Sequence, residues 1–442
     1  MELGSVIQQA EGIVNALGTA IEVEGVDLKE AEERILRFVH GIGALMLQEL
    51  VERVAEPVME NRVSVDGERA VYDQERNLRF RNRFGGVTVR PRRCYKFLDV
   101  PGGYYPLDEK LGLDKCGGFS PLVTFLLALL GSSRPYQESA RLLSKALGWR
   151  ISATAVQRNT EEAGRQLDDN PYRRINRRRR QRGCAVMVAQ MDSTTTPQIH
   201  QEPQITGRQS LKQPTEWKQC HVGCIQNFRA NGALIGEWAV SRYGTLEAFG
   251  WHLGRTALAM GMERAGKLVF LADGLAANWQ ICLDHFPGAL QTLDFYHASE
   301  HLAEFCALYS DSHKGSVTYQ RWRAMLLAGE VLQVMAEMRT CLNFLSARDE
   351  ATRHYNYFLN NAERMHYDRY KAQGLPIGSG KVEGSCKYIV GKRFKGSGMR
   401  WKKADNESVL RVRMGKLNGY LEPHYRATPR PYAFTPAPAL AS

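Results

Sequence analysis

The sequence predicts an α/β protein in which a mixed sheet with flanking helices follows an α+β N-terminal region. Three observations predict this class. From Cys184 onward, apolar β-rich segments come as three strands and a helix, then strand, helix, strand. Before that point, three short helical stretches lie between Pro121 and Leu167. The 442 residues, 43% of them hydrophobic, are enough for a substantial core and two to three domains.

The N-terminal hundred residues change character near their middle. Leu28 to Val58 carries apolar residues at helical spacing, which predicts a packing or dimerisation helix. Val63 to Phe97 alternates around Gly85-Gly86, which is typical of a twisted basic hairpin. Its arginines fit phosphate contacts and a solvated sheet face equally well.

The three helical stretches are separated at residues 131–133 and 148–150, a rhythm compatible with a helix-turn-helix. The third starts at Ser152, a good N-cap. Its side chains able to reach a DNA major groove are Thr154, Gln157, Arg158 and Asn159. A helical packing subdomain that contacts no DNA is the alternative.

A basic linker at 171–183 follows and includes Arg177, Arg178, Arg179 and Arg180. Such a run is often a solvated linker. Because this linker lies between a predicted DNA-binding region and a predicted catalytic core, its arginines would instead bind DNA phosphates and release counterions. We favour this phosphate contact. The formal charge of +12 favours a polyanionic partner such as DNA or RNA.

The order of strands from Cys184 is that of ribonuclease H-like folds, in which the first strand lies beside the fourth. Asp192 is predicted to end the first strand, CAVMVAQM, and Asp273 ends the fourth, KLVFLA. The two carboxylates would then emerge side by side, and a divalent cation relieves their repulsion. Taken singly, each aspartate also fits an ordinary turn.

A third acid, Glu383, opens a late helix. Ser379-Gly380 is a plausible N-cap, which places Glu383 in the first turn and Lys387 one turn later on the same face. The bases predicted to follow a DNA backbone are Lys387, Lys392, Arg393 and Lys395. A salt-bridged surface helix is the alternative, and Glu383 alone also fits a helix-start acid.

Together the three acids predict a catalytic site that binds two Mg²⁺ ions, with Mn²⁺ as a substitute. Asp294 and His297 are candidates to assist this metal site. HASEH at 297–301 fits the H-x-x-E-H zinc pattern, but no third ligand is evident and such short patterns arise by chance. Cys220, Cys224, Trp279 and Trp401 are expected in the core.

Several blocks of sequence resemble a known family, the DDE-type insertion-sequence transposases of the ISKra group. The blocks are MDSTTTP at 191–197, LADGLAANWQ at 271–280 followed by FPGALQTLDFYHASEHL, GLPIGSGKVEGSCKYIVGKRFKGSGMRW at 374–401, and PLDEKLGL at 106–113. The resemblance covers roughly the last 260 residues. It implies a ribonuclease H-like core, Asp192, Asp273 and Glu383 as metal ligands, a cut-and-join reaction on transposon ends, and a helical insertion before Glu383.

Two departures from the family pattern concern ligands. Relatives carry paired cysteines near the N-terminus that suggest a zinc ribbon, whereas this region holds only Cys94 and Cys116 without a CxxC pair. Zinc is therefore not expected. The first acidic block reads Asp-Ser where Asp-Gly is more usual, a change that the site should tolerate.

The sequence thus predicts a DNA transposase that binds element terminal inverted repeats and target DNA as a homo-oligomer. A related nuclease that does not join strands, and a non-catalytic DNA-binding derivative, are the alternatives. No membrane segment or signal is expected, and the nine cysteines favour a reduced, cytoplasmic protein associated with a prokaryotic nucleoid. The predicted regions are 1–100 (helix and hairpin), 101–170 (helix-turn-helix-like), 171–183 (linker), 184–296 and 373–425 (catalytic core), 297–372 (helical insertion) and 426–442 (tail).

Overall fold

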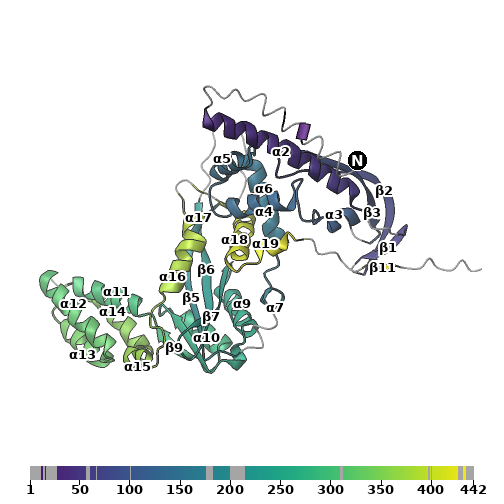
Figure 1. Cartoon of the computed structure of the whole chain (residues 1–442). Coiled ribbons are helices and arrows are strands. Elements are labelled where there is room, and N and C mark those ends of the chain that lie inside the picture. Colours follow the sequence, from purple (N-terminus) through teal and green to yellow (C-terminus); the bar gives the residue numbers. More distant parts are fainter. Residues whose placement is uncertain are drawn as a thin grey trace, which may run out of the picture. The chain divides into compact units, whose positions relative to one another are not determined.

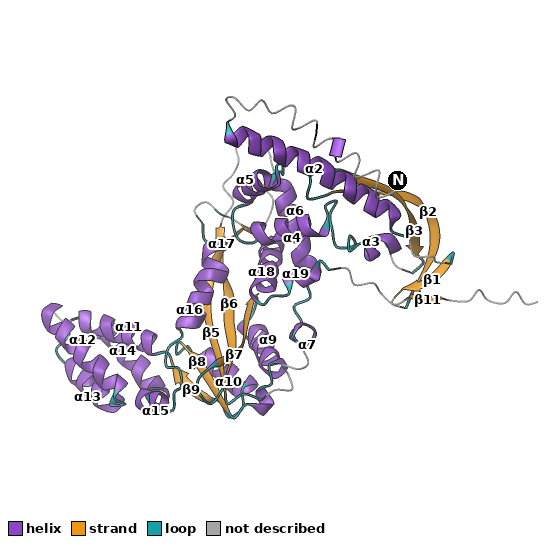
Figure 2. Cartoon of the chain, in the orientation of Figure 1, coloured by secondary structure: helices purple, strands orange, loops and turns teal. Residues whose placement is uncertain are grey.

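The computed structural model describes residues 11–12, 15, 27–55, 60–65, 67–99, 101–175, 183–199, 215–308, 312–396, 399, 401–426 and 432–434. The chain forms two compact units (Figures 1 and 2). Residues 1–167 and 419–442 make up the first, and residues 168–418 the second.

The first unit combines a long helix, a small sheet and a helical group. Its elements are α2 (Leu28–Arg53), β1 (Arg62–Val65), β2 (Glu68–Arg81), β3 (Val87–Phe97), β4 (Gly103–Tyr104), α3 (Pro106–Lys110), α4 (Pro121–Gly131), α5 (Tyr136–Leu147), α6 (Ala153–Gln166), α19 (Leu421–His424) and β11 (Tyr432–Phe434). The sheet has the order β11-β1-β2-β3-β4. The long helix and the basic hairpin predicted from the sequence are both present.

The three predicted helices α4, α5 and α6 pack around one apolar cluster that includes Leu127, Leu143 and Val156. Gly148 adopts φ 71° at the end of α5, a left-handed conformation that costs glycine little. As predicted, Ser152 caps α6, because its hydroxyl accepts the Ala155 amide at 3.1 Å. Asn159 is buried and donates to the Ala155 carbonyl, so it is not available to DNA as the sequence had suggested.

Close packing of α4 on α6 depends on Gly131. A Cβ there would lie 2.1 Å from Thr160 Oγ1 and 2.8 Å from Val156 Cγ1. We therefore expect Gly131→Ala to lower the free energy of unfolding by about 1–3 kcal/mol. Gly41→Ala in α2 is the control: it meets no atom within 4 Å, and stability should stay the same or rise by about 0.5–1 kcal/mol. Urea unfolding would measure both, and equal effects would refute this packing argument.

The second unit holds a mixed sheet with helices. Its elements are α7 (Pro171–Arg174), β5 (Val186–Ile199), β6 (Thr215–Phe228), β7 (Leu234–Tyr243), α9 (Leu246–Ala259), η1 (Met262–Arg264), β8 (Lys267–Ala272), α10 (Ala276–His285), β9 (Leu290–Leu293), α11 (Phe295–Ala307), α12 (Ser312–Leu327), α13 (Val331–Cys341), α14 (Arg348–Asn361), η2 (Ala362–Arg364), α15 (Tyr367–Ala372), α16 (Gly380–Ser385), η3 (Cys386–Gly391), α17 (Lys392–Phe394), β10 (Trp401–Lys402) and α18 (Lys403–Leu417).

The order of the sheet is β7-β6-β5-β8-β9, and β10 pairs with β5. β5, β6 and β7 are antiparallel neighbours, whereas β8 lies parallel to β5 and β9 parallel to β8. The predicted adjacency of the first and fourth strands is therefore confirmed. Buried apolar residues of β5 and β8, such as Val188 and Phe270, form the core of the sheet. The expected core residues Cys220, Cys224, Trp279 and Trp401 are all buried.

The first strand was predicted to end at Asp192, and this was wrong. β5 continues to Ile199, because Asp192 through Ile199 pair with β6 in an unbroken antiparallel ladder. The threonines of this stretch are β-branched and favour a strand. Asp192 thus lies within a strand, although the pairing of β5 with β8 ends just before it, at Gln190 and Leu271.

The predicted helical insertion consists of α11 to α15, which gather beside the β9 edge of the sheet (Figure 1). α11 begins at Phe295, capped by Asp294, whose carboxylate accepts the Tyr296 amide at 2.8 Å. Within the residues that the structure describes, no helix is long and apolar enough to span a membrane.

Candidate metal and catalytic site

Three aspartates occupy one row across β5, β8 and β9: Asp192 lies within β5, whereas Asp273 and Asp294 directly follow β8 and β9. β5 and β8 pair with an offset of 81 residues, as in Val186 with Lys267, and Asp273 follows Asp192 by the same 81. β8 and β9 pair with an offset of 21, as in Ala272 with Leu293, and Asp294 follows Asp273 by 21. Parallel strands in register therefore place Asp192, Asp273 and Asp294 at the same level of the sheet.

Asp192 is half-buried, and its Oδ1 accepts the Ser193 amide at 2.6 Å. Its carboxylate also lies against the thiol of Cys386, three residues after Glu383. Burial and this carboxylate raise the pKa of Cys386 well above its usual range. The contact brings the η3 turn onto β5 at the predicted acidic position.

Asp273 is held by the loop that enters α10. Its Oδ1 accepts the Leu275 amide at 3.2 Å and the buried Asn278 side chain at 2.7 Å. The Tyr357 hydroxyl donates to the Asp273 carbonyl oxygen at 2.9 Å. In the described part of the chain, Oδ2 accepts no hydrogen bond, which leaves this oxygen available to a cation.

Glu383 meets Asp294 and His297 in one cluster. One ligand atom from each of the three residues lies within 4.8 Å of the others. His297 Nδ1 lies 2.9 Å from Asp294 Oδ2, and the hydrogen bond to this carboxylate raises the pKa of His297 to about 9. Asp273 also contributes to that rise. Burial acts to raise the pKa of Asp294, but hydrogen bonds from His297, Ser379 and the Tyr296 amide together lower it.

The helix that carries Glu383 is fixed from two sides. Glu383 lies in the first turn of α16 as predicted, but Ser379 does not cap the helix with its side chain. Its hydroxyl donates to the buried Asp294 carboxylate, a charge-assisted hydrogen bond that ties the start of α16 to the end of β9. Behind the helix, the buried Arg413 of α18 donates to the carbonyl oxygens of Tyr388 and Ile389 in η3.

The predicted basic residues near Glu383 differ in exposure. Lys387 is 80% exposed, with Nζ 3.9 Å from Glu383, and Lys392 is also exposed. Lys395 is exposed and donates to Thr194. Arg393, in contrast, is only 2% exposed and lies over the Trp401 ring at 4.5 Å. The predicted phosphate contact of Arg393 is therefore wrong in this structure, because packing on Trp401 has buried its guanidinium.

The other predicted DNA contacts belong to α6 and to the linker. Gln157 and Arg158 are exposed on α6, and Gln157 donates to Glu161 at 2.8 Å. The linker arginines Arg177, Arg178, Arg179 and Arg180 lie outside the described residues.

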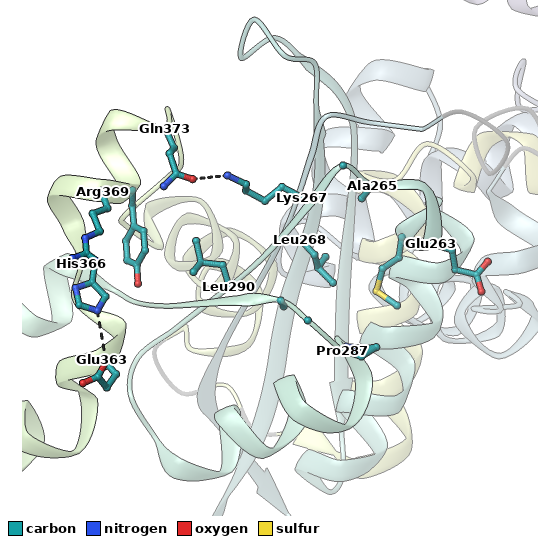
Figure 3. A pocket seen from close by; sticks show the side chains of 15 residues that line it. Glu263, Ala265, Lys267, Leu268, Pro287, Leu290, Glu363, His366, Arg369 and Gln373 are labelled. Atoms are coloured by element: carbon teal, nitrogen blue, oxygen red, sulfur yellow. Dashed lines mark hydrogen bonds and ion pairs between the residues drawn. The ribbon is translucent and has the colours of Figure 1, made fainter.

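Cavities lie near both ends of β8 among the described residues. One of about 660 Å³ borders the predicted site and is lined by Asp273, His297, His301 and Tyr357, among others. The other, of about 820 Å³, lies at the opposite end of β8, where Lys267, Glu363, His366 and Arg369 line it (Figure 3). No predicted site residue lines this second cavity, and its cations are interspersed with acids. We therefore place the candidate site at the row of aspartates.

Comparisons with known proteins give few constraints. Residues 21–204, less than half of the chain, match the model of a family described as "Uncharacterised protein family (UPF0236)". None of the curated proteins compared with the chain matches it. Among solved structures, the chain is similar to the Drosophila P element transposase strand transfer complex, with 12% identity and a TM-score of 0.27. That alignment covers 73% of this chain and 86% of the other, and such a score does not establish a shared fold.

Four residues of the site were missed by sequence reasoning: Asn278, Tyr357, Ser379 as a partner of Asp294, and Cys386. Asn278 lies five residues after Asp273, so the short sequence separation was the one signal for it. Tyr357 lies 84 residues from Asp273, and no local pattern connects them.

Proposed function

We propose that this protein is a metal-dependent DNA transposase with a ribonuclease H-like core, related to the insertion-sequence transposases of the ISKra group. Asp192, Asp273 and Glu383 would be its metal ligands. The observation that supports the proposal is the shared register of Asp192, Asp273 and Asp294, together with the cluster that Glu383 forms with Asp294 and His297.

The donor set fits magnesium. Three carboxylates supply hard oxygen ligands, and backbone or amide donors hold Asp192 and Asp273 through a single oxygen each. Two Mg²⁺ ions, or Mn²⁺ in their place, would activate a water or a 3′ hydroxyl and stabilise the leaving oxygen of an in-line displacement. Asn278 orients the Asp273 carboxylate, and Asp294 with Ser379 and His297 fixes the segment that carries Glu383.

DNA would be bound by basic and polar side chains in both units. Lys387, Lys392 and Lys395 are exposed around the Glu383 helix and suit backbone phosphates. The α4–α6 group, with Gln157 and Arg158 exposed, would act as a helix-turn-helix on terminal inverted repeats. We propose further phosphate contacts for Arg177, Arg178, Arg179 and Arg180. Joining two element ends to target DNA requires both ends to be held, which favours a homo-oligomer on DNA.

The test uses purified protein with Mg²⁺ or Mn²⁺ and labelled DNA carrying the element's flanking ends. Wild type should yield cleaved and strand-joined products, and Glu383→Gln should yield neither while still binding the DNA. Glu363→Gln, which replaces an exposed carboxylate near the distant cavity, is the matched control and should retain both products.

The products separate the proposal from its alternatives. Cleavage without joined strands would identify a nuclease with the same ligands. DNA binding without cleavage in the wild type, with either metal, would identify a non-catalytic DNA-binding protein and overturn the proposal.

A further inference from the structure

We propose a second metal site, selective for Zn²⁺ or a similar transition metal, formed by His301 and Glu304 of α11 with His354 of α14. It lies within the helical insertion and shares no ligand with the proposed magnesium site. The inference does not depend on the proposed function.

The geometry gathers three donor atoms around one point. His301 Nδ1 lies 3.0 Å from His354 Nδ1, and His354 Nδ1 lies 3.5 Å from a carboxylate oxygen of Glu304. One donor atom of each residue lies within 4.8 Å of the other two. Ligands bound at about 2.0–2.2 Å in a tetrahedral site are separated by roughly 3.3–3.6 Å, so small shifts would admit the ion.

The burial of His354 favours a ligand role over a solvated one. His354 is only 1% exposed, and its Nε2 has no hydrogen-bond partner among the described residues, so the polar contacts of this ring are concentrated at Nδ1. Burial lowers the pKa of His354. The pKa of His301 is lowered by its own burial and by the neighbouring His354 ring. Neutral imidazole is the form that binds metals.

The donor chemistry selects the type of ion. Two imidazole nitrogens and one carboxylate suit zinc and related transition metals, whereas magnesium prefers oxygen ligands only. Three protein ligands leave a fourth position for water. The sequence pattern HASEH had paired His297 with His301, but these two residues belong to different clusters. The additional ligand, His354, lies 53 residues from His301, so no short motif reveals the site.

Such an ion would tie α11 to α14 beside Tyr357. The His301 ring stacks on the Tyr357 ring with centroids 3.8 Å apart, and the Tyr357 hydroxyl contacts the Asp273 carbonyl. The metal would therefore stabilise the arrangement of the insertion against the loop that holds Asp273.

The experiment is a titration of the full-length, metal-free protein with Co²⁺, followed by its visible d–d absorption, and with Zn²⁺, followed by calorimetry. The background protein for all titrations is a triple variant that carries Asp192→Asn, Asp273→Asn and Glu383→Gln. These substitutions remove the carboxylates of the proposed magnesium site. This protein should bind one equivalent with a spectrum typical of nitrogen-rich, low-coordinate Co²⁺, and Zn²⁺ should raise its Tm.

Variants assign the ligands. Replacing a residue that only hydrogen-bonds to a zinc ligand weakens metal affinity about 10–100-fold. His354→Gln removes a ligand itself, so it should weaken Co²⁺ and Zn²⁺ affinity by at least ~100-fold. Glu304→Ala alters an exposed side chain, so it should fold normally and also weaken binding. Glu300→Ala, an exposed carboxylate one turn earlier, is the control and should bind as the background protein does. Absence of Co²⁺ binding in the background, or unchanged binding in the folded Glu304→Ala protein, would overturn the proposal.

Discussion

Asp192→Asn and Asp273→Asn should each reduce metal-dependent DNA cleavage by at least ~10³-fold. Each change leaves a neutral amide where the proposed site needs a charged oxygen ligand, and loss of a single electrostatic stabiliser alone costs about 10²–10³-fold. Stability should behave in the opposite way. Because the aspartates share one row with Asp294, removal of a charge relieves repulsion, and the free energy of unfolding should stay the same or rise.

Single-turnover cleavage assays and thermal unfolding, made on the same preparations, would test both halves of this prediction. Asp284→Asn is the matched control, since this exposed carboxylate of α10 contacts only Gln280 among the described side chains. Full activity in Asp192→Asn or Asp273→Asn would contradict the role of that residue. Inactivity accompanied by a large drop in stability would instead indicate a damaged fold.

Arg413→Met should lower the free energy of unfolding of the second unit by about 3–5 kcal/mol. This is the largest effect on stability that we expect from replacing one buried charged side chain. The Arg413 side chain donates to the Ile389 carbonyl at 2.6 Å and to the Tyr388 carbonyl, and it lies over the Tyr388 ring at 5.4 Å. Burial lowers its pKa to about 10. Methionine fills similar space but leaves two carbonyl oxygens of η3 without this donor.

The control is Arg411→Met, two positions earlier on α18, where the side chain is half-buried. Urea unfolding followed by tryptophan fluorescence should show a change below about 0.5–1 kcal/mol for this variant. Because η3 continues the helix of Glu383, Arg413→Met should also reduce cleavage more than Arg411→Met does. Equal stabilities of the two variants would show that Arg413 does not support η3.

The sheet was predictable because its information is local and periodic. Apolar β-rich segments such as KLVFLA mark buried strands, and the order of elements defined which strands are neighbours. The boundary of β5 was not predictable in the same way, because MDSTTTPQI has polar and β-branched residues that fit a loop and a strand alike. Its long pairing with β6 decided the outcome.

In the candidate site, too, some residues could be predicted from the local sequence and others could not. Asp273 and Glu383 were suggested by their positions at element ends, Asp192 by its place after the apolar segment CAVMVAQM, and all three by the family resemblance. Asp294 with His297 was suggested by the following strand end. Side chains whose role depends on tertiary packing were not. Ser379 looked like a helix cap and bonds Asp294 instead, and Arg393 looked like a phosphate ligand but is buried on Trp401. Burial of a charged residue depends on distant partners that a sequence does not display.

The most direct test of the central claim maps the metal on the protein itself. Fe²⁺ is substituted for Mg²⁺, and ascorbate with peroxide then generates hydroxyl radicals that cut the backbone next to the bound ion. The account predicts cuts near Asp192, Asp273 and Glu383 together, all competed by Mg²⁺ and all lost in Asp273→Asn. Cuts confined to α11 and α14, or no localised cuts while the protein remains folded, would contradict a metal centre built from these three segments.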